Sequence, residues 1–153
     1  MAVTKNNPNT IHLGGPITLI NEYVALGAIT PGMLVEYHND SGTLKWDVHD
    51  AAADVQIPYV ALNQAELNKE VDDAYAAGDL VAVGALTVGS QFWGIIPSGQ
   101  NISPAAYLQS NGDGKLKAAT ADTAAAAVAK FQAVETSGGA VTADTRIRVE
   151  VVR

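Results

Sequence analysis

The stretch MLVEYHNDSGTLKWDV, residues 33–48, decides the fold class of this chain. Alternate residues share one face of a strand, so residues 33–38 and residues 43–48 would each present one apolar and one more polar face. Between them, NDSG at residues 39–42 combines turn-forming side chains with a glycine, which adopts a positive φ at no steric cost. The pattern predicts an antiparallel hairpin. Its apolar residues are Met33, Val35 and Tyr37 in the first strand and Leu44, Trp46 and Val48 in the second.

The sequence RIRVEVV, residues 146–152, alternates more regularly than any other part of the chain. This pattern predicts a strand in which Ile147, Val149 and Val151 face the core. Further short apolar stretches predict strands at residues 57–62, 80–83, 88–96 and 128–135.

The segments between these strands favour turns and loops. NGDGK at residues 111–115 predicts another hairpin turn, and residues 64–77 predict a long loop with one helical turn. The alanine-rich residues 118–126 fit a helix or a loop, of which we favour the loop. Many short strands separated by turns indicate an all-β fold, either a small β-barrel or a sandwich.

The first twenty residues differ in character from the rest of the chain. They are polar up to Asn9, and Gly14-Gly15-Pro16 interrupts any regular element. One interpretation is a frayed terminus over about the first ten residues. The other is an extended arm that becomes ordered on another subunit, and it explains why apolar residues occupy odd positions that share one side of an extended chain. These residues are Ile11, Leu13, Ile17 and Leu19. We predict an N-terminal arm over residues 1–20 and a single β-rich domain over residues 21–153.

Length, composition and charge exclude several classes of protein. A chain of 153 residues with 48% hydrophobic and 16% charged residues fits one globular domain. Nine Lys and Arg against sixteen Asp and Glu give a net charge of -7, which opposes binding to nucleic acid. No apolar run approaches the ~20 residues that span a bilayer, and the N-terminus lacks the apolar region of a signal peptide. Because the chain has no cysteine, disulfides and thiolate chemistry are excluded.

The residue types that commonly perform catalysis do not form a known pattern. The histidines, His12, His38 and His49, lack metal-ligand spacing and are predicted to be solvated or locally hydrogen-bonded. No serine lies in a G-x-S-x-G elbow. The carboxylates Asp72, Asp73 and Asp79 fall in a polar loop without neighbouring Trp or Phe, which predicts a solvated acidic loop. We therefore expect no enzymatic activity, no metal and no cofactor.

Phe92 and Trp93 are adjacent large aromatic residues in a predicted strand. Neighbouring residues of a strand point to opposite faces, so one of them would be buried and the other would lie against a partner. The alternative is that both are buried, either between two covered faces or because the chain bends at Gly94.

The order of short motifs resembles that of the small capsid decoration, or cement, proteins of tailed bacteriophages. The motifs are AITPGMLV at residues 28–35, the turn at Gly42, AGDLVAV at 77–83, NGDGKL at 111–116 and RIRV at 146–149. The resemblance covers residues 28–152 and implies a compact β-barrel or β-tulip. It also implies a trimer on the outer surface of the mature head, which bridges neighbouring major capsid subunits and is assembled in the host bacterial cytoplasm.

The resemblance and the residues together predict a structural virion protein. Its partners would be the major capsid protein and further copies of itself, with neither nucleic acid nor a membrane involved. The predicted interface residues are Ile11, Leu13, Ile17, Leu19, Phe92 and Trp93.

Two alternatives belong to other classes of protein. One is another virion component, such as a head fibre base or a tail-tube protein. The other is a carbohydrate-binding β-sandwich in which Trp46, Trp93 and Tyr107 form a platform for sugar rings.

Overall fold

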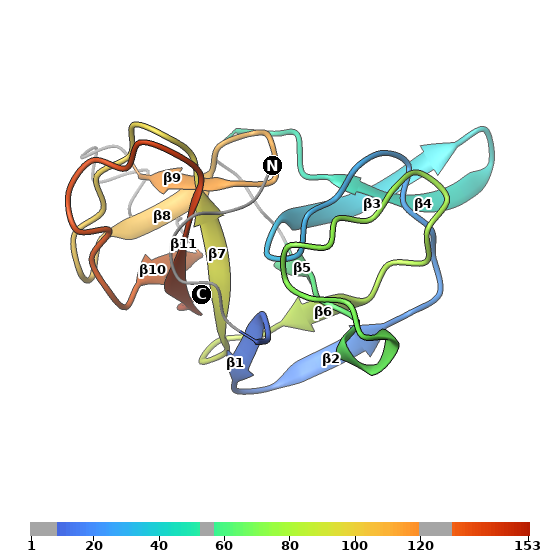
Figure 1. Cartoon of the computed structure of the whole chain (residues 1–153), viewed down its shortest axis with the longest axis horizontal. Coiled ribbons are helices and arrows are strands. Elements are labelled where there is room, and N and C mark those ends of the chain that lie inside the picture. The colour runs from blue at the N-terminus through green and yellow to red at the C-terminus, as the bar shows by residue number, and fades with distance from the viewer. Residues whose placement is uncertain (1–8, 53–56, 120–129) are drawn as a thin grey trace.

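The computed structural model describes residues 9–52, 57–119 and 130–153. Within these ranges the chain forms eleven β-strands in two antiparallel sheets, which lie next to each other in Figure 1, and one short 3-10 helix, η1 (Ala65–Leu67). The six-stranded sheet has the order β1 (His12–Gly14), β7 (Gln91–Ile96), β11 (Thr145–Val151), β10 (Phe131–Ala133), β8 (Tyr107–Ser110) and β9 (Leu116–Ala118). The five-stranded sheet has the order β2 (Ile17–Ile20), β6 (Val83–Leu86), β5 (Tyr59–Ala61), β3 (Leu34–Asp40) and β4 (Thr43–Val48). The all-β prediction is confirmed, with a sandwich-like arrangement.

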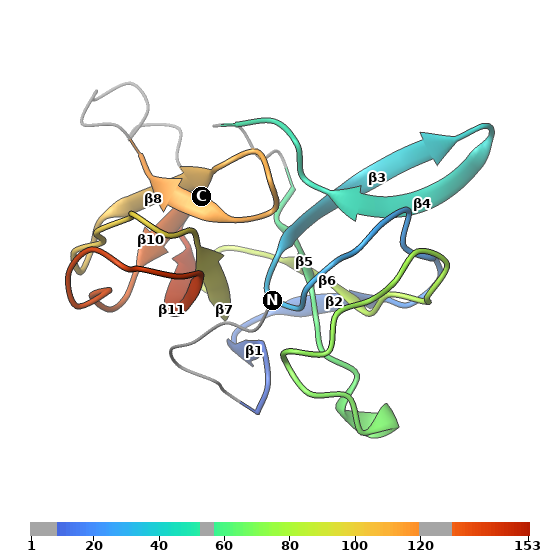
Figure 2. The ribbon, with the colours of Figure 1, turned by 45° about the horizontal axis from the view of Figure 1, so that its top comes forward.

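The hairpin predicted from residues 33–48 is formed by β3 and β4, which run side by side in Figure 2. Its register places Val35 opposite Val48 and Tyr37 opposite Trp46, so the predicted apolar residues share one face. The two-residue loop has positive φ at both positions, 52° at Ser41 and 91° at Gly42, as in the tight turns that match the twist of a hairpin.

The six-stranded sheet curls strongly without closing into a barrel. Strand β9 approaches β7 so closely that a Cβ atom at Gly94 would lie 2.7 Å from Leu116 Cδ1, yet the two strands do not pair. Residues before and at the start of β3 contact both sides of this gap. Gly32 lies against the carbonyl oxygen of Trp93, and the Leu34 N–H donates to the Gly114 carbonyl at 2.7 Å. The second sheet is therefore joined to the first at the place where a barrel would close.

The segment predicted to be an arm, residues 1–20, belongs to both sheets from residue 12 onward. Strand β1 pairs with β7, and β2 pairs with β6, so the chain crosses from one sheet to the other between β1 and β2 (Figure 1). Gly15 has φ +87°, and a Cβ atom there would lie 2.6 Å from Ser90 Cα. Strands β1 and β2 of the predicted arm therefore pair with backbone groups of β7 and β6 that would otherwise form sheet edges, and the domain boundary at residue 20 stays a prediction. The first eight residues of the predicted arm lie outside the described ranges.

The buried apolar residues form two separate hydrophobic cores. The main core lies between the two sheets and takes residues from both, such as Leu34 and Val60 from one sheet and Phe92 and Val149 from the other. The second core lies on the outer face of the five-stranded sheet. There the sheet residues Val35, Trp46, Ala61 and Val83 are covered by Ala25, Ile29, Tyr75 and Val81 from the connecting segments.

Most of the other predicted elements are present with shifted ends. The strand predicted at residues 57–62 is β5, and the helical turn predicted within residues 64–77 is η1. The strand predicted at residues 80–83 shares only Val83 with β6, which continues through Gly84, while Leu80 forms an isolated bridge with Val24. A Cβ atom at Gly84 would lie 2.6 Å from Ile17 Cδ1, so glycine is used there to admit a neighbouring side chain and does not end the strand.

The last two strands follow the predicted pattern. Strand β11 buries Ile147, Val149 and Val151. In the predicted strand at residues 128–135 the described part is β10, and most of the loop predicted before it lies outside the described ranges.

Candidate functional site

The predicted interface residues do not share one surface. Ile11 and Phe92 are fully buried, and Ile17 and Trp93 are half-buried against the main core. Leu13 and Leu19 are 40% and 61% exposed. Leu13 lies on β1, Ile17 and Leu19 lie on β2 of the other sheet, and Ile11 directly precedes β1. The turn at Gly15 breaks the stripe that an extended chain would have formed. Among these predicted residues, Leu13 and Leu19 can meet a partner without rearrangement.

Phe92 and Trp93 both pack against the main core, Phe92 fully buried and Trp93 half-buried. The Phe92 ring packs edge-on against Phe131, with ring centroids 5.9 Å apart. Trp93 pairs with Arg148 across the sheet and is partly exposed as a residue. Phe92 is thus a core residue, and contact of Trp93 with a partner stays a prediction.

The sugar platform predicted from Trp46, Trp93 and Tyr107 is not formed. Trp46 lies on β4 of the five-stranded sheet and is fully buried, whereas Trp93 and Tyr107 lie on the other sheet. An aromatic surface exists elsewhere, and the sequence pattern did not reveal it because its members come from three separate segments. We define the aromatic cluster as Tyr23, Tyr37, Trp46 and Tyr59.

Tyr37 lies at the centre of the aromatic cluster. Its ring stacks on Trp46 with centroids 4.3 Å apart and planes inclined by 18°. Tyr23 and Tyr59 meet it edge-on at 5.6 Å and 5.3 Å. Tyr37 is 40% exposed although Trp46 behind it is fully buried, so the cluster presents a fixed ring to solvent.

A cavity of about 440 Å³ adjoins Tyr37. Strand β3 pairs with β5 only at Leu34 and Val35, because Pro58 precedes β5 and cannot donate to a ladder. Beyond Val35 no described residue pairs with this side of β3, and residues from both faces of the strand line the same cavity. The lining residues with polar groups are Glu36, Tyr37, His49 and Tyr59.

The phenol of Tyr37 has a raised pKa at this cavity. Burial is the largest cause that raises the pKa of Tyr37 above its usual value, and the neighbouring Tyr59, Tyr23 and Glu22 raise it further. Its phenol therefore stays protonated and can donate a hydrogen bond at neutral pH. Glu36 Oε2 lies 3.8 Å from His49 Nε2.

His49 was predicted to be solvated or locally hydrogen-bonded, which is wrong. It is buried, and its Nδ1 lies 2.9 Å from Oγ of Ser110, a residue of the other sheet. Ser110 Oγ also accepts the Gly112 N–H at 3.1 Å. Ser110, His49 and Glu36 thus lie in a row, as in a catalytic triad. Ser110 is fully buried, so its hydroxyl is a structural link between the sheets.

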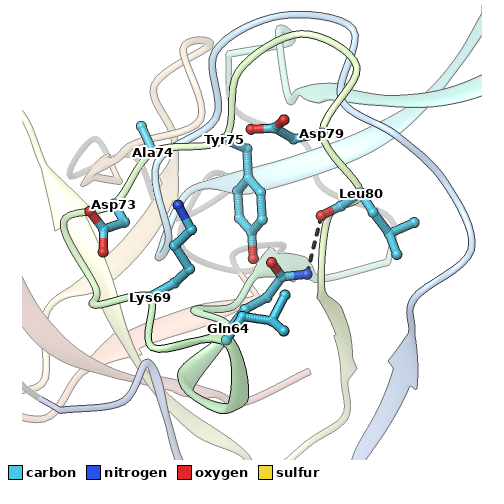
Figure 3. Close-up of a pocket in the computed structure, with 8 residues that line it drawn as sticks. Gln64, Lys69, Asp73, Ala74, Tyr75, Asp79 and Leu80 are labelled. Carbon is cyan, nitrogen blue, oxygen red and sulfur yellow. Dashed lines mark hydrogen bonds between the residues drawn. The ribbon is translucent and has the colours of Figure 1, made fainter.

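A second cavity, of about 250 Å³, lies beside η1 (Figure 3). Figure 3 shows the Lys69 side chain extending beside the Tyr75 ring, and the Lys69 ammonium has no hydrogen bond or ion pair with any described residue. Asp73 and Asp79 on the rim each accept a backbone N–H, from Glu70 and Ala76 respectively. The cavity is smaller than the ~300–1,000 Å³ typical of small-molecule sites.

Tyr75 forms the wall of this second cavity. Its hydroxyl donates to the Leu62 carbonyl, and burial raises its pKa to about 12. Tyr75 therefore serves to fix the segment that covers the second core.

The acidic loop is also more structured than predicted. Asp73 and Asp79 stabilise turns, and Asp72 accepts a hydrogen bond at 2.8 Å from the buried Arg146. The expectation of a merely solvated loop is therefore wrong for Asp72.

No group of three or more His, Asp or Glu side chains in the described ranges could hold a metal ion. No helix in this part of the chain is both long and apolar enough to cross a bilayer.

The chain resembles a known protein in its fold but matches none in its sequence. The sequence matches no protein-family model and no curated protein. The structure is similar to the crystal structure of the N base of head fibre protein gp8.5 of bacteriophage phi29, with a TM-score of 0.56 and 15% sequence identity. The likeness covers 89% of this chain and 94% of that chain, so it includes strands of both sheets. The two chains share a fold.

Proposed function

We propose that this chain is a non-enzymatic structural protein of a bacteriophage head, which acts on the outer surface of the capsid. The observation that carries the proposal is the likeness of fold to the base of a phage head fibre over nearly the whole length of both chains. The order of sequence motifs, which resembles that of capsid decoration proteins, supports the same class of protein.

The surface of the molecule is compatible with attachment to a repeating lattice. Leu13 and Leu19 are exposed on β1 and β2, each of which is an edge strand of its sheet. Weak apolar contacts of this kind become effective when many copies or several subunits bind together. The net charge of -7 suits a position away from packaged DNA.

Two forms of attachment are proposed. In the first, the chain is the base of a head fibre, which the name of the similar structure favours. In the second, favoured by the motif order, it is a cement protein that binds as a trimer and bridges neighbouring subunits of the major capsid protein.

Immunogold labelling of virions from the phage that encodes this chain tests the class. We expect label on mature heads. Label confined to tails would favour a tail-tube protein, and virions without the protein would overturn the proposal.

Capsids prepared with and without the protein separate the two forms. A cement protein raises the temperature at which heads release DNA, whereas a fibre base leaves this temperature unchanged and its absence removes visible fibres.

The attachment surface is tested with the double variant Leu13→Ser, Leu19→Ser, which should bind capsids less well than the wild type. Leu67→Ser is the matched control because Leu67 is 62% exposed, similar to Leu19. Equal binding by both variants would contradict the role of the two strands.

A further inference from the structure

We propose that the cavity beside Tyr37 is a saccharide-binding site for an uncharged hexopyranose or N-acetylhexosamine unit. The site is separate from the capsid-binding surface proposed above, and it can be tested on the isolated protein.

The first support is the fixed aromatic ring. A pyranose ring has an apolar face of C–H groups that packs against an aromatic face, and such contacts are favourable when the aromatic ring is already held in place. Tyr37 satisfies this condition, since Trp46 stacks on one face at 4.3 Å and two further tyrosines pack against it edge-on. The 40% of Tyr37 that remains exposed is the part that faces away from this support.

The second support is the set of polar groups next to the ring. Saccharide hydroxyls need both acceptors and donors at the rim of the stacking surface. Glu36 supplies a carboxylate with two acceptor oxygens, and the side chains of Tyr59 and His49 line the same cavity. The Glu36 side chain is 36% exposed, so it is accessible to a ligand from solvent.

The third support is size. The cavity of about 440 Å³ falls within the ~300–1,000 Å³ range of small-molecule sites, whereas the cavity beside Lys69 does not. Its volume admits one sugar ring with part of a second, so an oligosaccharide would bind with one unit on Tyr37 and the others toward solvent.

Charge selects among saccharides. Glu36 lies in the cavity wall and Glu22 acts on Tyr37, while the chain as a whole carries a net charge of -7. A sialic or uronic acid would be repelled by this field. The ligand is therefore a neutral sugar.

The experiment follows amide chemical shifts of the labelled full chain during titration with chitotetraose, cellotetraose and maltotetraose. Each is added up to about 10 mM, tenfold above the ~1 mM dissociation constant of a weak single site. We expect at least one of them to shift signals of residues 35–37 and 59 in a saturable manner. Failure of all three to do so would overturn the proposal, as would equal binding of the acidic control 3′-sialyllactose.

Three variants assign the binding to the site. Tyr37→Ala should weaken binding at least tenfold, and Glu36→Gln, which keeps the size of the side chain, should weaken it several-fold. Tyr107→Ala is the control because Tyr107 is a partly exposed tyrosine on the other sheet. Tyr37→Phe keeps the stacking ring and should retain most of the affinity, so it tests the site even if Tyr37→Ala unfolds. Binding that is unchanged in Glu36→Gln, or that is lost equally in Tyr107→Ala, would contradict the assignment.

Discussion

Arg146 on β11 donates a hydrogen bond from Nη1 to Asp72 Oδ1 at 2.8 Å, across 74 residues of chain. Its Nη2 donates to the carbonyl oxygens of Val71 and Pro31 at 2.6 and 3.1 Å. Arg146 is fully buried, so these partners replace the water that a guanidinium normally binds. One side chain thus ties the six-stranded sheet to two segments that cover or lead into the five-stranded sheet.

Substitution of Arg146 should destabilise the fold strongly. Arg146→Ala leaves the Asp72 carboxylate and two carbonyl groups without their donor, and we expect a loss of ~3–5 kcal/mol in the free energy of unfolding. Urea denaturation measures this loss. Arg148→Ala, two residues away on the same strand, is the control because the Arg148 side chain is 47% exposed in its ion pair with Glu135. It should cost less than ~1 kcal/mol. Equal costs for the two variants would show that the buried network contributes little.

The inclusion of the N-terminal segment in the fold predicts different effects at two nearby residues. Ile11 is fully buried in the main core, so Ile11→Ala should cost ~2–5 kcal/mol. Leu13 is 40% exposed, and Leu13→Ala should change stability by about 0.5 kcal/mol or less. Thermal or urea unfolding of both variants checks this difference. A small effect at both positions would mean that the segment is a detachable arm after all.

Gly84 should not tolerate a side chain. A Cβ atom there would lie 2.6 Å from Ile17 Cδ1 and 3.4 Å from Leu62 Cδ1, so Gly84→Ala must displace β2 or its side chains. We expect a loss of ~1–3 kcal/mol, as for other overpacked sites. Gly27→Ala is the control because a Cβ atom there meets nothing within 4 Å. Hydrogen exchange of the β2 and β6 amides would localise the effect, and unchanged protection in Gly84→Ala would contradict it.

Stability should fall at alkaline pH through Tyr75. Its pKa is raised from 10.0 to about 12 by burial, so the folded state holds the proton more tightly than the unfolded state does. The contribution is constant below pH ~10 and is lost as pH rises toward ~12, because the unfolded chain then releases its proton first. A shift of this size corresponds to at most ~2–3 kcal/mol.

Urea unfolding of the wild type and Tyr75→Phe between neutral and alkaline pH isolates this effect. The variant loses the hydrogen bond to the Leu62 carbonyl and is expected to be less stable at neutral pH. Its free energy of unfolding should decline less steeply above pH ~10 than that of the wild type. Parallel curves for the two proteins would show that Tyr75 does not titrate in the folded state at a raised pKa.

Local sequence patterns predicted the strands but not which segments of the chain cover their faces. The alternation in residues 146–152 correctly identified Ile147 and Val149 as inward-facing. The same alternation would place Arg146 in solvent, yet the other face of β11 is covered there by residues 31 and 71–72. Periodicity reports which residues share a face, and it does not report what covers that face.

The candidate site was even less accessible to sequence reasoning. Tyr23, Tyr37 and Tyr59 belong to three segments, and their association depends on the pairing of β3 with both β4 and β5. The sugar platform expected from Trp46 failed because a large aromatic residue in a strand can face either core or solvent, and sequence alone does not distinguish the two.

The sequence by itself determined the all-β class, the β3–β4 hairpin and the absence of cysteine chemistry, because alternation and turn residues act over a few neighbouring positions. The tertiary structure decided that β1 and β2 complete the sheets, that Arg146 and His49 are buried links and that an aromatic cavity exists. These features arise from contacts between residues far apart in the chain, whose energies depend on which surfaces meet and not on the local order of residues.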